Sequence, residues 1–128
     1  TMSTIKVDAV EPRTTSSTIT IGAAASNITA LTSASTITID FNDNNNFSVT
    51  LGHNATFANP SNPTAGQTGS IFITQDGTGS RTASWGTNWD FIGGSAPTLT
   101  TTAAAIDRID YVIVDSSNIQ AVATLNYS

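Results

Sequence analysis

The stretch that decides the fold is Asp107-Arg108-Ile109-Asp110-Tyr111-Val112-Ile113-Val114-Asp115, which is followed by Ser116-Ser117-Asn118 and then by residues 119–126. β-Branched and aromatic side chains are concentrated in it, as is typical of strands. The Ser-Ser-Asn triplet is typical of a turn. We therefore predict a strand over Asp107–Asp115, a tight turn, and a closing strand over Ile119–Asn126.

The composition of the whole chain favours the same class of structure. Thr, Ile and Val number 23, 13 and 6, about a third of the 128 residues, whereas Leu numbers only 4 and Lys and Glu one each. β-Branched residues favour strands, and strong helix formers are scarce. The sequence predicts an all-β protein.

Further alternating runs lie upstream. Ile37, Ile39 and Phe41 alternate with polar residues before the Asn-rich stretch 42–46, and a second run covers 47–51, so we predict a β-hairpin. A second hairpin is predicted from residues 70–85 around the turn Asp76-Gly77-Thr78-Gly79. With about seven strands, the expected architecture is a β-sandwich or jelly-roll-like body.

The N-terminal part is predicted to be organised differently. Ile5–Asp8 and Thr18–Ile21 alternate over very short lengths. The low-complexity stretch Ala23–Ala34 is consistent with a linker or with a short helix through its Ala run, and we favour the linker. We predict an extended attachment segment and linker over 1–34, and a β-sandwich-like domain over 35–128. Because the chain is poor in large apolar residues, we expect its subunits to associate.

Charge and composition disfavour several function classes. Four Lys and Arg against nine Asp and Glu give a net charge of −5, which disfavours nucleic-acid partners and binding to anionic membranes. No apolar run approaches the ~20 residues of a membrane-spanning helix, and we expect no secretory signal. There is no cysteine, so the chain can form neither disulfides nor thiolate zinc sites.

Trp85 and Trp89, with Phe91, form the densest aromatic cluster and are the first candidate binding residues. Exposed aromatic side chains bind sugars or proteins, but a chain with so little Leu needs them in its core, and that interpretation is favoured. Arg81, a further candidate, is expected to pair with a nearby aspartate instead of a ligand, and so is Arg108.

The stretch from Asp40 contains the weak candidates for a metal site. Asp40, Asn42 and Asn44, with Asn46, occupy positions 1, 3, 5 and 7 of a calcium loop. The sixth position is not Gly, however, and the twelfth is Leu51 in place of a bidentate Glu. A turn explains these residues without a metal, and we expect neither a metal nor a cofactor.

Catalytic motifs are weak throughout. His53 is the only histidine, and no Gly-x-Ser-x-Gly motif is present. Asp107 and Asp110 are oddly spaced on a predicted strand, so they should point to opposite faces and cannot flank one glycosidic bond. Asp76 and Asp90 lie in predicted loops, and nothing in the sequence brings them together. We expect no enzymatic activity.

Several segments carry a resemblance to a protein family. They are Asn46–Leu51, Gly66–Ile71, Gln75–Gly86, Gly93–Thr102 and Ala121–Ser128. Together they resemble a module of tail-fibre and other virion-surface proteins of tailed bacteriophages, notably phages of aquatic bacteria including cyanobacteria. The opening Ser3–Asp8 is similar to the start of fibre segments in such phages. The chain is shorter than most such fibres, and Trp89–Ile92 stands where the family is expected to be more basic and to contain proline.

The resemblance implies a non-enzymatic virion structural protein, with no catalytic residues to carry over. The leading interpretation is a short fibre or spike component on the particle surface that forms homotrimers. It is assembled in the host cytoplasm and contacts other virion proteins. In that role the loops around 59–63 and 86–96 would face outward, toward a host surface glycan. The alternative is a capsid decoration protein that stabilises the head, and the less favoured one is a small glycan-degrading tail enzyme.

Overall fold

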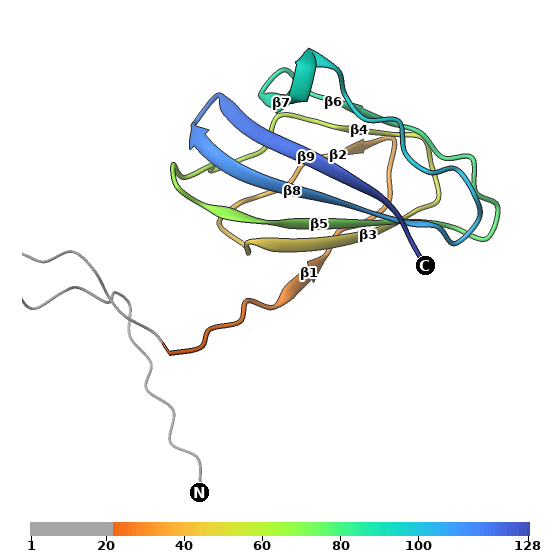
Figure 1. Cartoon of the computed structure of the whole chain (residues 1–128), viewed down its shortest axis with the longest axis horizontal. Helices are drawn as coiled ribbons and strands as arrows, with labels where there is room; N and C mark the ends of the chain where they lie inside the picture. The colour runs from red at the N-terminus through yellow and green to blue at the C-terminus, as the bar shows by residue number, and fades with distance from the viewer. Residues whose placement is uncertain (1–21) are drawn as a thin grey trace, which may run out of the picture.

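The computed structural model describes residues 22–128, which form nine strands and one short 3-10 helix, η1 (Figure 1). The prediction of an all-β protein is confirmed. The elements are β1 (Ile28–Ala30), β2 (Thr36–Ile37), β3 (Asn46–Leu51), β4 (Ala55–Phe57), β5 (Thr68–Gln75), β6 (Ala83–Trp85), β7 (Trp89–Phe91), η1 (Ile92–Gly94), β8 (Ile106–Asp115) and β9 (Asn118–Tyr127).

The strands belong to two sheets. The large sheet has six strands in the order β1-β3-β5-β8-β9-β7, and the small sheet has three in the order β2-β4-β6. From β1 to β6 the chain alternates between them, and each strand is parallel to the previous strand of its own sheet. From β1 to β6 the chain therefore winds as parallel coils, each contributing one strand to each sheet.

Both upstream hairpin predictions are wrong. The run around Ile37 belongs to the small sheet and pairs with β4, whereas β3 belongs to the large sheet and pairs with β1 and β5. In the same way, β5 and β6 lie in different sheets. Alternation shows that one face of a strand is buried, but strands on either side of a core bury the same pattern of side chains.

The predicted C-terminal hairpin is confirmed. β8 and β9 are antiparallel, and Asp115 lies opposite Asn118 across the turn. β8 also pairs antiparallel with β5, and β9 pairs parallel with β7. The long hairpin thus completes the large sheet beside the coil.

Both sheets bury their apolar side chains in one core. Ile37 and Phe57 reach it from the small sheet, and Phe47, Ile71 and Ile109 from the large sheet. Isoleucine and aromatic rings supply most of its bulk, as the scarcity of leucine requires. Phe41 contacts Phe47, Trp89 and Tyr111 with ring centroids 5.0–6.3 Å apart, within the usual range for aromatic pairs.

The predicted linker over Ala23–Ala34 contains a strand, so this prediction needs correction. Residues 28–30 form β1, which pairs with β3 at the edge of the large sheet, and Leu31 packs against the core. Low complexity concealed the strand, because only Ile28 and Leu31 in this stretch are large and apolar. The two strands predicted at Ile5–Asp8 and Thr18–Ile21 lie outside the described residues.

Candidate interaction surface

The outer face of the β8–β9 hairpin carries an exposed apolar strip, formed by Val112, Val114 and Val122. Ile109, Tyr111 and Ile113 point inward along β8. Because side chains alternate along a strand, Val112 and Val114 of β8 point outward. The three valines are 44–48% exposed. Val112 lies opposite Gln120, and Asp110 lies opposite Val122, which places all these side chains on one face.

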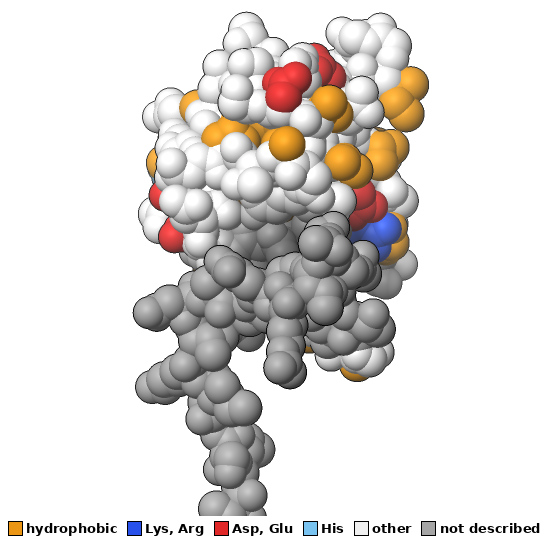
Figure 2. Space-filling view, turned by 90° about the vertical axis from the view of Figure 1, so that its left-hand side faces the viewer, with side chains coloured by type: hydrophobic (Ala, Val, Ile, Leu, Met, Phe, Trp, Pro, Cys, Tyr) orange, Lys and Arg blue, Asp and Glu red, His pale blue; other side chains and the backbone are white. Residues whose placement is uncertain are grey.

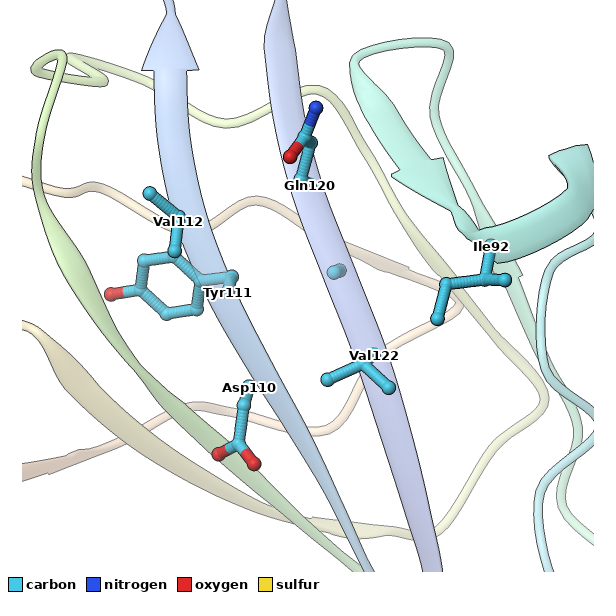
Figure 3. A pocket seen from close by; sticks show the side chains of 7 residues that line it. Ile92, Asp110, Tyr111, Val112, Gln120 and Val122 are labelled. Carbon is cyan, nitrogen blue, oxygen red and sulfur yellow. The ribbon is translucent and has the colours of Figure 1, made fainter.

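A shallow groove lies beside this strip. Its volume is about 300 Å³, and Val112, Gln120 and Val122 line it together with Ile92 of η1. Figure 3 shows Ile92 and Val122 facing each other across the groove. Ile92 is 82% exposed, the highest value among the large apolar side chains of residues 22–128. Gly93 and Gly94, with φ of 71° and 70°, form the tight turn that holds Ile92 there.

Arg108 and Asp110, which lie near the strip, are paired with each other. Arg108 Nε lies 3.0 Å from the Asp110 carboxylate, which also accepts a hydrogen bond from the Ser70 hydroxyl. The Arg108 guanidinium stacks 5.1 Å from the centre of the Tyr127 ring. Asp110 is the one carboxylate that lines the groove. The strip therefore presents apolar surface beside one ion pair and the exposed carboxylate of Asp90, which lies opposite Gln120. Apolar surface of this kind is covered by protein partners.

Figure 2 shows a neighbouring face of the molecule, on which charged side chains are few. Hydrophobic side chains lie in several places among uncharged polar atoms. The sparse charge of the sequence is thus visible on the folded surface.

The candidate residues Trp85 and Trp89 lie at the side of the core. Trp89 is buried, and its Nε1 donates to the carbonyl of Ala58 at 3.1 Å. Trp85 is half-buried and stacks on Phe57, with ring centroids 4.5 Å apart and an interplanar angle of 13°. Its Nε1 is buried without a hydrogen-bond partner. Trp89 packs as a core residue, whereas Trp85 packs against the core and also lines a cavity of about 440 Å³ together with Arg81 and Leu99.

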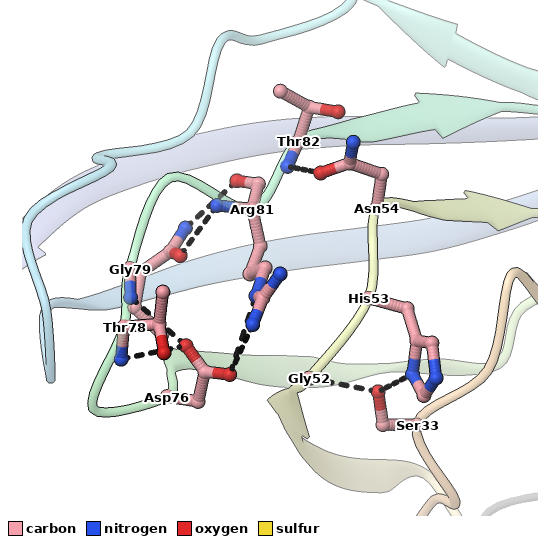
Figure 4. Close-up of polar contacts among 10 residues, drawn as sticks. Ser33, Gly52, His53, Asn54, Asp76, Thr78, Gly79, Arg81 and Thr82 are labelled. Carbon is pink, nitrogen blue, oxygen red and sulfur yellow. Dashed lines mark hydrogen bonds and ion pairs between the residues drawn. The ribbon is translucent and has the colours of Figure 1, made fainter.

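The candidate Arg81 pairs with Asp76, as expected of a nearby aspartate (Figure 4). Its Nη2 lies 2.7 Å from one carboxylate oxygen, while the other oxygen accepts the backbone N–H groups of Thr78 and Gly79. The hydrogen bond from Arg81 is the main cause that lowers the pKa of Asp76. The arrangement ties the Asp76–Gly79 turn to β6 and leaves the guanidinium occupied.

The weak metal candidates take part in hydrogen bonds within and around their own turn. Asp40 accepts hydrogen bonds of 2.9 Å from the backbone N–H of Asn42 and from the side chain of Asn62. The Asn44 oxygen accepts the N–H of Asn45, and its amide nitrogen donates to Thr29. Within residues 22–128, no three His, Asp or Glu side chains form a group that could hold a metal ion.

His53 has a serine neighbour. Its Nδ1 lies 3.1 Å from the Ser33 hydroxyl, which also accepts the backbone N–H of Gly52 (Figure 4). In the part of the chain that the structure describes, no carboxylate hydrogen-bonds to His53, so the pair lacks the group that orients the base of a triad. Asp107 and Asp110 point to opposite faces of β8, as predicted.

Sequence reasoning missed Gln75 and did not anticipate that Asp107 is buried; these are the two buried polar side chains of the described residues. Gln75 donates to the carbonyls of Arg81 and Thr100 and accepts the N–H of Arg81, each at 2.9 Å. Asp107 accepts the N–H groups of Thr100 and Asn126. Both side chains hold the segment 96–105 to the sheet. In the sequence, their burial was indicated only by spacing: Gln75 lies two positions after the inward-facing Ile73, and Asp107 lies two positions before the inward-facing Ile109.

Comparison with known proteins gives no relative: no family model, no curated protein and no solved structure matches the chain. Among the described residues, no helix has the length and apolar character needed to cross a membrane.

Proposed function

We propose that the protein is a non-enzymatic structural component of a phage particle, of the short fibre or spike type. In this proposal its two sheets form a sandwich-like or jelly-roll-like body that assembles into homotrimers on the particle surface. The resemblance of Gln75–Gly86 and the C-terminal segment to virion-surface modules motivates the phage assignment.

The observation that supports an assembling role is the apolar strip on β8 and β9. Val112, Val114 and Val122 stand exposed on the outer face of the β8–β9 hairpin, exposed Ile92 lies across the groove, and Arg108 and Asp110 nearby are paired with each other. A chain that buries little apolar area by itself gains stability when such a strip is covered by a copy or by another virion protein.

The experiment measures mass in solution by light scattering at micromolar concentration. We expect a trimer for the unaltered chain and a monomer for the double variant Val112→Asp/Val122→Asp, because two buried carboxylates would face apolar surface. Thr50→Asp is the matched control, since Thr50 lies on the same sheet but two strands away, and it should stay trimeric. A monomeric unaltered chain would overturn the proposal of a homotrimer.

Capsid decoration is the second candidate function, and in that role the same strip would lie against a shell subunit. Copy number separates the two roles: hundreds of copies per particle indicate decoration, and far fewer indicate a fibre. Shortening of host surface polysaccharide by the protein would overturn both in favour of an enzyme.

A further inference from the structure

The small sheet has an open edge at β6. In Figure 1, β6 lies beyond β4 on the side away from β2, and β4 is its one sheet neighbour among the described residues. The Thr82 carbonyl accepts an N–H from β4, and the Gly86 N–H donates to a carbonyl of β4. Because alternate residues of a strand direct their backbone groups to opposite edges, the N–H and C=O groups of Ala83 and Trp85 face the open edge.

The groups at this edge are unpaired. No hydrogen bond within residues 22–128 joins the backbone N–H and C=O groups of Ala83 and Trp85 to a partner beyond β4. The indole Nε1 of Trp85 is the one buried side-chain nitrogen or oxygen of the described chain without a partner. Unpaired backbone groups of this kind are a template for another extended chain.

A cavity separates this edge from the segment that follows η1. Its volume is about 440 Å³; residues 81–85 line one side, and residues 96–99 and 101 line the other. Pro97 is half-buried and Leu99 is buried, whereas the residues that alternate with them are exposed, so the second side is itself extended. We call this cavity the β6 slot. Its volume lies within the range of about 300–1,000 Å³ that is usual for ligand sites.

The side chain of Gln75 bridges the two sides of the slot at one end. There, the Ser80 N–H donates to the Thr101 carbonyl at 2.7 Å, so the two segments touch. Next to this contact, Gln75 Nε2 donates to the carbonyls of Arg81 and Thr100, each at 2.9 Å. Beyond Gln75, the two segments form no hydrogen bond with each other in the described part of the chain. The slot is therefore a gap between two segments that the buried amide holds at a fixed separation.

We infer that the β6 slot binds an extended, uncharged peptide segment with small side chains, which adds to the small sheet as a strand beside β6. Its backbone supplies acceptors and donors to Ala83 and Trp85, and main-chain hydrogen bonds of this kind provide the affinity in strand addition. Residues 81–85 span about 13 Å at about 3.3 Å per residue, which is room for four or five residues of the peptide.

The walls of the slot determine which side chains fit. Paired residues of neighbouring strands share a face, so the peptide side chain opposite Trp85 points toward the core, where a hydroxyl can accept the indole N–H. Arg81 is the one charged residue that lines the slot, and its guanidinium is paired with Asp76. A peptide rich in Ala, Ser and Thr therefore fits the slot best.

A peptide is favoured over a saccharide by the nature of the unpaired groups. Four of the five belong to the backbone of alternate residues and have the spacing of a sheet ladder, which an extended chain matches. In addition, one face of the Trp85 ring is already covered by Phe57, with ring centroids 4.5 Å apart. This inference does not rest on the proposed virion role.

Amide hydrogen exchange of the full chain tests the inference. The probe is acetyl-Thr-Ala-Thr-Ala-Thr-amide, and its matched control is the same peptide methylated at every backbone nitrogen, which can neither donate to a strand nor approach it closely. We expect about 5 mM probe to slow exchange of the Ala83 and Trp85 amides severalfold, because bound peptide accepts their hydrogen bonds, and we expect no effect of the methylated peptide. The Ser84 amide faces β4 and should be unaffected by either peptide.

Two proline variants locate the binding edge. Ala83→Pro removes an N–H at the open edge of β6 and leaves the bonds to β4, because proline is tolerated on edge strands where its nitrogen faces outward. We expect it to weaken probe binding about fivefold or more, the value of one hydrogen bond. Thr36→Pro is the matched control on β2, at the opposite edge of the small sheet, where the nitrogen also faces away from β4. This variant should bind the probe as the unaltered chain does.

Three results would overturn the inference. The first is unchanged exchange of the Ala83 and Trp85 amides at about 5 mM probe in the unaltered chain, which is decisive even if a variant fails to fold. The second is an equal loss of probe binding in the two proline variants. The third is protection of these amides by maltotriose and not by the probe, which would assign the slot to a saccharide.

Discussion

The carboxylate of Asp107 accepts a hydrogen bond of 2.7 Å from the backbone N–H of Thr100, which lies in the segment between η1 and β8. Its other oxygen accepts the N–H of Asn126 at 2.8 Å, beside a register shift between β8 and β9. Asp107 is 2% exposed. One buried carboxylate therefore joins a loop and the irregular end of β9 to the large sheet. Both connections require that each of its two oxygens accepts a hydrogen bond.

Asp107→Asn should lower the free energy of unfolding by about 2–3 kcal/mol, because the amide nitrogen would face one of the two backbone donors and leave it without an acceptor. Urea unfolding measures the loss. Asp90→Asn, at an exposed position on β7, is the control and should change stability by less than about 0.5 kcal/mol. Equal effects at both positions would show that Asp107 does not hold the loop.

Gly69→Ala should destabilise the protein by about 1–3 kcal/mol, because a Cβ there would overlap the backbone carbonyl of Asn45 and crowd the Tyr111 hydroxyl. Gly77 is the matched control, since a Cβ there meets no atom within 4 Å. Thermal unfolding of the two variants gives the comparison. A Gly69→Ala variant as stable as Gly77→Ala would contradict the close approach of β5 to the 42–46 turn.

The stability of the protein should depend more on the indole N–H of Trp89 than on that of Trp85. Trp89→Phe removes the hydrogen bond to Ala58 and leaves that carbonyl unpaired, whereas Trp85→Phe removes a donor that has no partner. We expect Trp89→Phe to cost about 1 kcal/mol more than Trp85→Phe in the free energy of unfolding. Denaturant titration followed by circular dichroism is suitable, because it does not depend on tryptophan fluorescence. The reverse order would rule out this assignment of the two indoles.

Acid should weaken the fold. Hydrogen bonds from Asn62, from Arg81 and from the Ser117 backbone are the main causes that lower the pKa values of Asp40, Asp76 and Asp115, respectively, below 3.8. The unfolded chain then binds protons more readily than the folded one. The three carboxylates therefore contribute fully to the free energy of unfolding above their unfolded pKa, and this contribution is lost as the pH falls through their folded pKa values. Urea unfolding at pH 6 and at about pH 3 should show lower stability at the acid pH.

The variant Asp40→Asn/Asp76→Asn/Asp115→Asn is the control for this pH dependence. It should be less stable at pH 6 and lose less on acidification, because the titrating groups are gone. An unchanged difference between the two pH values would assign the acid effect to other carboxylates.

The candidate site residues differ in how far sequence could place them. Arg81 was expected to pair with an aspartate and does so with Asp76, because the two are only five positions apart across a turn. The strip of Val112, Val114 and Val122 was not anticipated, since a run of valines in a strand is equally consistent with burial on both faces. Ile92 joins the strip only because β7 lies beside β9 in the folded sheet.

By itself, the sequence determined that the protein is built of strands and that Asp107–Asn126 forms a hairpin, because alternation and a tight turn are local properties. Only the tertiary structure decided that the strands from Ile28 to Trp85 wind as parallel coils between two sheets. Period-2 alternation specifies which side of a strand is buried and leaves its neighbour open. Which strand becomes the neighbour depends on the loops that connect the two sheets, such as 40–45, because these loops decide which distant backbone groups come into register.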